Sequence, residues 1–289
     1  MGKFEGYYVR CSNADTSVAF IFGRQKCKKK QSSFIMVLTE ATSHYTEFDH
    51  SECEIQREPL RIVIGANSLT QEGITLDINN DEFKLKCDIK FGPFVPLKYG
   101  AMGPFRFLPF MECFHTVVSM NHAISGQIDL NGQVTDFENG HGYIEGDRGR
   151  SFPEKYFWSQ YTSLTENLSI SASCATIPYL GLKFTGTICF VRFNGHEHRF
   201  ATYLGARVEK FEKNKLFIVQ GFGKHLKTFE VEVLDTDKNQ QKLPAPIHGN
   251  MTQTIKESVV TSVRYKLIVG SQVLFDITGH NAAFEFFKK

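Results

Sequence analysis

The stretch Leu182-Lys-Phe-Thr-Gly-Thr-Ile-Cys-Phe-Val-Arg-Phe-Asn-Gly195 alternates apolar side chains with small or polar ones. Because successive side chains of a strand point to opposite faces, one face of this stretch carries four apolar residues, namely Leu182, Phe184, Ile188 and Phe190. The stretch ends at Asn194-Gly195, a dipeptide typical of a type I′ hairpin turn. It therefore predicts a β-strand that enters a hairpin.

The same alternation recurs along the chain, for example over residues 229–234 and 262–269. Turn dipeptides such as Asn131-Gly132 and Asn139-Gly140 separate these runs. Many short strands with tight turns are typical of sandwiches and barrels. So many of them in one chain predict an all-β protein of two antiparallel closed barrels or sheets packed together, divided into residues 1–150 and 151–289.

A single helix is predicted, near residues 152–160. Ser151-Phe-Pro-Glu154 combines a capping serine, an early proline and a glutamate three residues on, which matches a capping box. The helix would carry Tyr156, Phe157 and Trp158, the chain's one tryptophan.

Composition limits the classes of protein that the chain can belong to. Its 289 residues are 42% hydrophobic, and 33 basic residues nearly balance 31 acidic ones. A core can therefore be buried, and no overall field attracts nucleic acid. No run approaches the ~20 apolar residues of a membrane span, so we expect at most peripheral membrane contact. The N-terminus has no apolar targeting region, and the seven cysteines contain no C-x-x-C pair, which favours a cytoplasmic protein with reduced thiols.

Several enzyme signatures are excluded by spacing. Gly140-His-Gly-Tyr-Ile-Glu-Gly146 misses the dinucleotide fingerprint by one residue, and the sequence has neither a Walker loop nor a nucleophile elbow. His196 and His198 would face one side of a strand and could bind a metal. A lone histidine pair on a hairpin is more commonly a solvated feature, so no metal and no cofactor are predicted.

The richest concentration of chemistry lies in residues 136–160. Glu145 and Asp147 would share a strand face, about 7 Å apart at a rise of ~3.3 Å per residue. Burial and mutual repulsion would favour a protonated carboxyl group there, whereas Arg148 and Arg150 would stabilise the carboxylates. The pair is therefore either a proton-donating site or an ion-pair cluster that fastens the turn.

Two histidines lie in the apolar run Met111-Glu-Cys-Phe-His-Thr-Val-Val-Ser-Met-Asn-His122. His115 and His122 are either core side chains satisfied by a hydrogen bond or polar groups that project into a barrel interior.

The segment Gly142-Tyr-Ile-Glu-Gly-Asp-Arg-Gly-Arg-Ser-Phe-Pro-Glu-Lys-Tyr-Phe-Trp-Ser-Gln160 resembles the signature of the tocopherol cyclase family. Two further segments, residues 4–10 and 243–258, are similar to the family's opening and its C-terminal Ala-Pro region. Tyr7 stands where the family commonly has tryptophan, and Arg148 where it often has an aromatic residue. The resemblance implies a pair of lipocalin-like β-barrels.

The resemblance also implies a reaction, the acid-catalysed cyclisation of a prenylated hydroquinone by an isomerase-type (intramolecular cyclase) enzyme. The acid would be Asp147 or Glu145. Substrate contacts would come from the rings of Tyr156, Phe157 and Trp158 and from the polar side chains of Gln160, Arg150, His115 and His122. Alkene hydration is a related possibility. The alternative is a non-catalytic carrier of an isoprenoid, carotenoid or fatty acyl ligand, and in each case the partner is an apolar small molecule.

Overall fold

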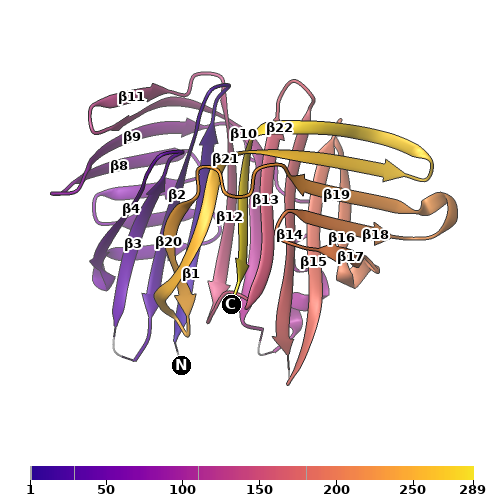
Figure 1. The fold of residues 1–289 in the computed structure, drawn as a ribbon. Coiled ribbons are helices and arrows are strands. Elements are labelled where there is room, and N and C mark those ends of the chain that lie inside the picture. The colour runs from indigo at the N-terminus through magenta and orange to yellow at the C-terminus, as the bar shows by residue number, and fades with distance from the viewer. Residues whose placement is uncertain (1, 29, 110, 180) are drawn as a thin grey trace. The chain divides into compact units, whose positions relative to one another are not determined.

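The computed structural model describes residues 2–28, 30–109, 111–179 and 181–289. In these ranges the regular structure is mainly β-strand, in two antiparallel sheets (Figure 1), as the sequence predicts. The chain divides into two compact units. The first comprises residues 1–97, 115–151 and 244–253, and the second comprises residues 98–114, 152–243 and 254–289.

The sheet of the first unit has the order β4-β3-β2-β1-β12-β10-β9-β8-β7-β6-β5, with β11 paired to β10. Its two edge strands are consecutive in the chain and are joined by the 3-10 turn η1 (His50–Glu52). The strands are β1 (Lys3–Ser12), β2 (Ser17–Lys26), β3 (Gln31–Leu38), β4 (Ser43–Asp49), β5 (Cys53–Gln56), β6 (Arg61–Ile64), β7 (Asn67–Thr70), β8 (Gly73–Asn79), β9 (Lys84–Phe91), β10 (Cys113–Leu130), β11 (Gln133–Asp136) and β12 (Gly140–Gly149).

This sheet curls around one core, because a single hydrophobic cluster draws buried side chains from strands along its whole width, including Val9, Phe20, Ile35, Ile62 and Leu85. In the described residues, however, no strand pairing joins β4 to β5. The prediction of closed barrels is therefore wrong. The chain passes from β4 to β5 through η1, where Asp49 and Glu52 form a capping box. A 3-10 turn does not form the backbone hydrogen bonds that would pair β4 with β5.

The sheet of the second unit repeats this design, in the order β16-β15-β14-β13-β22-β21-β19-β18-β17, with β20 paired to β21. Its edge strands are joined by η3 (Thr202–Leu204). A second hydrophobic cluster, which includes Phe157, Ile170, Val191, Leu216 and Phe284, fills its concave side. The strands are β13 (Lys155–Ser163), β14 (Leu168–Tyr179), β15 (Leu182–Phe193), β16 (His196–Ala201), β17 (Arg207–Phe211), β18 (Lys215–Gln220), β19 (Lys227–Val233), β20 (Gln241–Ile247), β21 (Asn250–Val269) and β22 (Gln272–Lys288).

The hairpin predicted at Asn194-Gly195 is confirmed. β15 and β16 are antiparallel neighbours, and the two turn residues have φ angles of 48° and 79°, both positive as a type I′ turn requires. The core side of β15 is the face that carries Cys189 and Val191. The opposite face carries Phe190, which packs under the guanidinium of Arg199 at 4.8 Å.

The helix predicted near residues 152–160 is wrong, because this region forms β13, which pairs with β14 and β22. The side chains of β13 alternate between its two faces. Phe157 packs in the core, and Tyr156 and Trp158 lie on the other face of the strand. Ser151 does not cap a helix, and its hydroxyl accepts a hydrogen bond from the His248 amide at 2.9 Å.

The helices in the described ranges are short 3-10 turns, which also include η2 (Gly103–Phe107) and η4 (Gly223–His225). None of them has the length and apolar character needed to cross a membrane. All seven cysteines are free thiols.

Candidate active site

Strand β12 places a row of polar side chains on the convex face of the first sheet. Ile144 belongs to the core, so Tyr143, Glu145 and Asp147 point to the opposite side. Glu145 is nevertheless buried, with 6% of its surface exposed. Glu145 and Asp147 therefore share one face of β12, as the sequence predicts.

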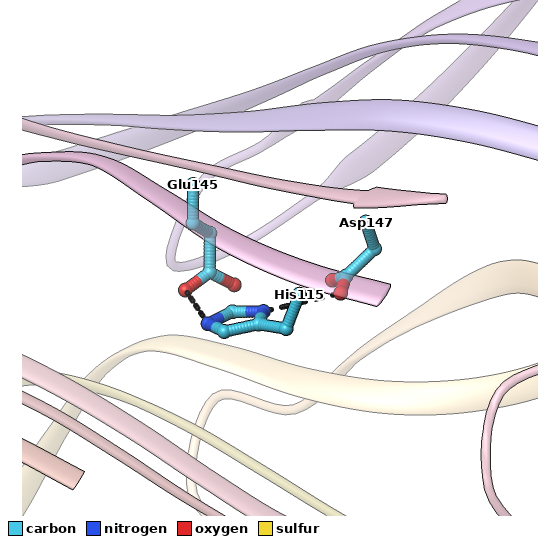
Figure 2. A group of neighbouring side chains, drawn as sticks. All are labelled: His115, Glu145 and Asp147. Carbon is cyan, nitrogen blue, oxygen red and sulfur yellow. Dashed lines mark hydrogen bonds and ion pairs between the residues drawn. The ribbon is translucent and has the colours of Figure 1, made fainter. Parts of the chain in front are cut away.

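His115, on β10, lies between the two carboxylates (Figure 2). Its Nδ1 is 3.1 Å from Oδ1 of Asp147, and its Nε2 is 3.6 Å from Oε2 of Glu145. The imidazole thus presents each ring nitrogen to a different carboxylate. Residue 115 is 32 positions from residue 147, so this arrangement depends on the packing of β10 beside β12 in the sheet.

Two opposing effects set the charge of His115. Burial is the largest single effect and lowers the pKa of the imidazole. The negative charges of Asp147 and Glu145, together with the hydrogen bond to Asp147, outweigh burial and raise the pKa to about 9. The ring is therefore an imidazolium at neutral pH, which donates a hydrogen bond from Nδ1 to Asp147 and forms an ion pair through Nε2 with Glu145. When both carboxylates are ionised, the three groups together carry one net negative charge.

Tyr143 extends this group along the strand. Its hydroxyl donates a hydrogen bond of 2.5 Å to Oε2 of Glu145, the oxygen that also faces His115. Tyr143, Glu145, His115 and Asp147 thereby form a connected row, which we call the acid–histidine row. In such a buried row the hydrogen bonds of Tyr143 to Glu145 and of His115 to Asp147 are electrostatically stronger than they would be in water.

Three members of the row, His115, Glu145 and Asp147, also offer metal-ligand atoms, which lie within 4.8 Å of one another. Imidazole and carboxylates suit several divalent ions. A metal needs the deprotonated imidazole, however, and a metal bound at Nδ1 of His115 would have to displace the proton of its hydrogen bond to Asp147. The arrangement therefore fits proton chemistry better than metal binding.

Neighbouring β1 adds a second set of buried polar groups that the sequence analysis missed. Arg10 is 1% exposed, lies opposite Tyr143 in the strand register, and donates to the hydroxyl of Ser17 at 2.8 Å. Ser17 and Ser12 share a hydrogen bond of 2.7 Å. The signal in the sequence is the alternation of Arg10 and Ser12 with the apolar residues of this strand.

Arg148 and Arg150, which follow Asp147 in the sequence, do not lie beside it on its face of β12. Arg148 lies on the opposite face of β12 by alternation, where its charge lowers the pKa of Tyr7 against the larger raising effect of burial. Arg150 follows the end of β12, is half-buried, and its carbonyl accepts from the amide of Gly249 at 2.6 Å.

His122 lies on the core side of the first sheet, the opposite face from His115. Its ring packs edge-on against Phe91 at 4.6 Å and against Phe94 at 4.9 Å. Its Nδ1 is 3.0 Å from the Ser119 hydroxyl, which donates to the Asn121 carbonyl, so Nδ1 is the donor and Nε2 carries the lone pair. Burial, with a smaller effect of His141, lowers the pKa of His122 to about 3, so it is a neutral core histidine.

The remaining predicted residues belong to the second unit. Tyr156, Trp158 and Gln160 occupy one face of β13 and are all buried. The hydroxyl of Tyr156 donates to Glu285, and Nε2 of Gln160 donates to the Thr162 hydroxyl at 3.1 Å.

Phe157 points the other way on β13 and packs against Phe284 at 5.4 Å within the core. Phe157 therefore does not share the strand face of Tyr156 and Trp158, with which the sequence analysis grouped it.

The second unit also holds two buried carboxylates that sequence reasoning missed, those of Glu257 and Glu285, which are 3% and 8% exposed. They are direct partners across β21 and β22. A glutamate inside an otherwise apolar stretch, as in Phe284-Glu-Phe286, is the sequence signal that marks such a position.

Two curled antiparallel sheets, one of which buries a carboxylate–imidazole–carboxylate group on its convex face, define an all-β protein with acid–base groups. The model of the tocopherol cyclase-like family matches residues 67–286, so the chain belongs to this family. No curated protein matches the sequence.

Solved structures show the same fold at low identity. A protein described as AttH from Nitrosomonas europaea has a TM-score of 0.55 at 12% identity, covering 99% of this chain and 92% of that one. Kievitone hydratase from Nectria haematococca has a TM-score of 0.54 at 11% identity, covering 100% and 89%. CghA, solved with Sch210972, has a TM-score of 0.56 at 7% identity, covering 99% and 88%.

Proposed function

We propose that this protein is an enzyme that protonates an alkene of an isoprenoid-type substrate, a prenylated hydroquinone, and directs an oxygen nucleophile to the resulting cation. The observation that carries the proposal is the burial of His115 between Glu145 and Asp147. Membership of the tocopherol cyclase-like family supports it. A structural neighbour named a hydratase supports the same general chemistry, because hydration and cyclisation both begin with addition of a proton.

In the cyclisation, Asp147 or Glu145 starts as the protonated acid and donates its proton to the less substituted alkene carbon, which leaves the row with one net negative charge. The phenol oxygen then bonds to the tertiary cation and loses its own proton to the carboxylate. The acid is thereby regenerated, and the product is an isomer of the substrate. In hydration, water takes the place of the phenol oxygen, and the product contains one added water.

The acid–histidine row has a separate task for each member. The imidazolium of His115 holds both carboxylates in place and can return a proton to either. The net negative charge of the row stabilises positive charge that develops on the substrate, and such fixed charges act more strongly in a buried site than in water. Tyr156 and Trp158 belong to the second unit and stay separate candidates for ligand contacts of that unit, where an aromatic ring contributes about 0.5–2 kcal/mol against a cation.

The test is conversion of a prenylated hydroquinone in buffered D2O, followed by mass spectrometry. Cyclisation gives a product with one carbon-bound deuterium and no added water, and hydration gives a product that also contains one water. The Asp147→Asn and Glu145→Gln variants report on the acid, and loss of the carboxyl group that donates the proton should lower the rate by about 10²–10⁴-fold. Full turnover by both variants contradicts the assignment of the acid.

A non-catalytic carrier is the second candidate. The observation in its favour is a hollow of about 270 Å3 at the second sheet, lined by Leu168, Phe193, Phe275 and Ile277 together with Glu166 and Asn194. This is slightly below the ~300–1,000 Å3 of common ligand pockets. Recovery of an unchanged lipid from the purified protein, without conversion of the hydroquinone, would favour carriage.

A further inference from the structure

The second unit displays a group of large apolar side chains at its surface. Four of them are strongly exposed, Tyr99 (67%), Phe107 (73%), Leu182 (75%) and Leu204 (51%). Single exposed apolar side chains are ordinary on soluble proteins, whereas grouped ones mark an interaction surface. We call these four residues the apolar patch.

Three half-buried rings, those of Phe105, Phe184 and Tyr203, connect the segments that carry the patch. Phe105 packs against Tyr203 at 5.6 Å and against Phe184 at 6.3 Å. Phe107 lies two residues after Phe105 on η2, and Leu204 directly follows Tyr203 on η3. Leu182 shares its face of β15 with Phe184 by alternation. The patch therefore surrounds one cluster of three aromatic rings.

The segment that carries Tyr99 is firmly anchored. Arg199 donates to the carbonyls of Tyr99 at 2.7 Å and Gly100 at 3.1 Å, and the Tyr203 hydroxyl donates to the carbonyl of Ala101 at 2.9 Å. Glu197 balances the charge of Arg199 at 2.9 Å. The exposed rings thus stand on a fixed base, and their exposure is a property of the folded surface.

Cations accompany the patch. The three segments that form it, residues 98–107, 182–184 and 202–207, contain four basic residues and no acidic one. These are Lys98, Arg106, Lys183 and Arg207. Arg106 lies 4.5 Å from the ring of Phe107 and Lys98 lies 5.8 Å from that of Tyr99, while Lys183 pairs with Glu154 and Arg207 lies 3.7 Å from Glu209.

We propose that this patch docks the protein on an anionic lipid surface. Aromatic and aliphatic side chains can enter the boundary between headgroups and acyl chains, while the long stems of lysine and arginine keep their charges at the headgroups. Each basic residue near an anionic membrane contributes about 1 kcal/mol, which corresponds to roughly fivefold in affinity. The inference does not depend on the reaction proposed above.

The experiment is co-sedimentation of the full chain with vesicles of phosphatidylcholine alone or mixed with phosphatidylglycerol. The wild type should bind the mixed vesicles, and high salt should weaken the binding. Phe107→Ser combined with Leu182→Ser should lower affinity at least tenfold. The matched control is Leu234→Ser combined with Val273→Ser, which removes two other exposed apolar side chains of the same unit, 55% and 51% exposed.

A second variant separates charge from apolar contact. Lys98→Ser combined with Arg106→Ser should weaken binding to the anionic vesicles about 25-fold, at fivefold per charge, and leave thermal unfolding unchanged. Equal sedimentation of the patch variant and the control overturns the proposal. So does failure of the wild type to bind, or concentration-dependent self-association that the patch variant abolishes, because the patch would then be a contact between copies.

Discussion

The Nε2 atom of His122 lies directly over Gly142, so that a Cβ on residue 142 would come within 2.3 Å of it. Gly142→Ala should therefore force the buried ring aside and cost about 1–3 kcal/mol of stability. Thermal or urea unfolding measures this loss. Gly100→Ala is the control, because a Cβ at residue 100 meets nothing within 4 Å. Equal stability of the two variants would show that the ring yields without strain.

Stability should fall on the alkaline side because of His115. Its pKa of about 9 in the folded protein exceeds the ~6.5 of an unfolded histidine. The stabilisation from its bound proton is therefore complete below about pH 6.5 and is lost as the pH rises through about 9. Urea unfolding across this range should show the decline.

The slope of that decline is the diagnostic quantity. His115→Asn should flatten it, whereas the exposed His196→Asn should leave it unchanged. A slope that survives in His115→Asn would assign the titration to another group.

Stability should also fall on the acid side, through two other histidines. Burial is the main cause that lowers the pKa values of His122 and His141, to about 3 and about 4. Both remain neutral in the folded state while the unfolded chain takes up protons below pH ~6.5, so their contribution is lost as the pH falls from there toward 4 and 3. His122→Gln should reduce the dependence on pH in this window. An unchanged profile would contradict the assignment.

Tyr143→Phe should destabilise the protein by about 1.5–3 kcal/mol, the usual range for a hydrogen bond to a charged group. It removes the donor to Glu145 and should also slow the proposed reaction. Tyr45→Phe provides a matched control, because Tyr45 donates to the exposed Glu47 with the same two-residue spacing on the half-buried strand β4, at 3.4 Å. Similar losses in both variants would mean that burial of the Tyr143 pair adds nothing.

Trp158 provides a direct probe of binding in the second unit. It is the chain's one tryptophan and is 7% exposed, so its emission should be that of an apolar environment and should shift to the red on unfolding. A prenylated quinone that contacts it should quench this emission in a saturable manner. Quenching no stronger than that of free tryptophan at the same quinone concentration would remove Trp158 from the candidate ligand contacts of that unit.

Short sequence patterns correctly predicted the features that depend only on neighbouring residues. Asn194-Gly195 encodes its turn through the positive φ angles that both residues adopt, and no distant contact is needed. The shared face of Glu145 and Asp147 likewise follows from the period of a strand. The helix prediction failed because a capping pattern at Ser151 fixes only a helix start, and pairing with β14 and β22 outweighs it.

Local sequence patterns could not predict which histidine pairs with Glu145 and Asp147. Sequence alone names both His115 and His122 but does not give the register of β10 beside β12. Their separation of seven residues is odd, however, so in one regular strand they must point to opposite faces, and only one of them could join the carboxylates. The structure assigns that place to His115.

Strand β22 lies in the interior of its sheet, hydrogen-bonded between β13 and β21, although it follows both of them in the sequence. During synthesis, the five strands β17 to β21 therefore cannot be joined to β13 until residues 272–288 have left the ribosome. A premature stop before residue 272 would leave two separate half-sheets with open edges, which are prone to pair with other chains. Strand β22 is thus the segment that connects the two halves of the second sheet.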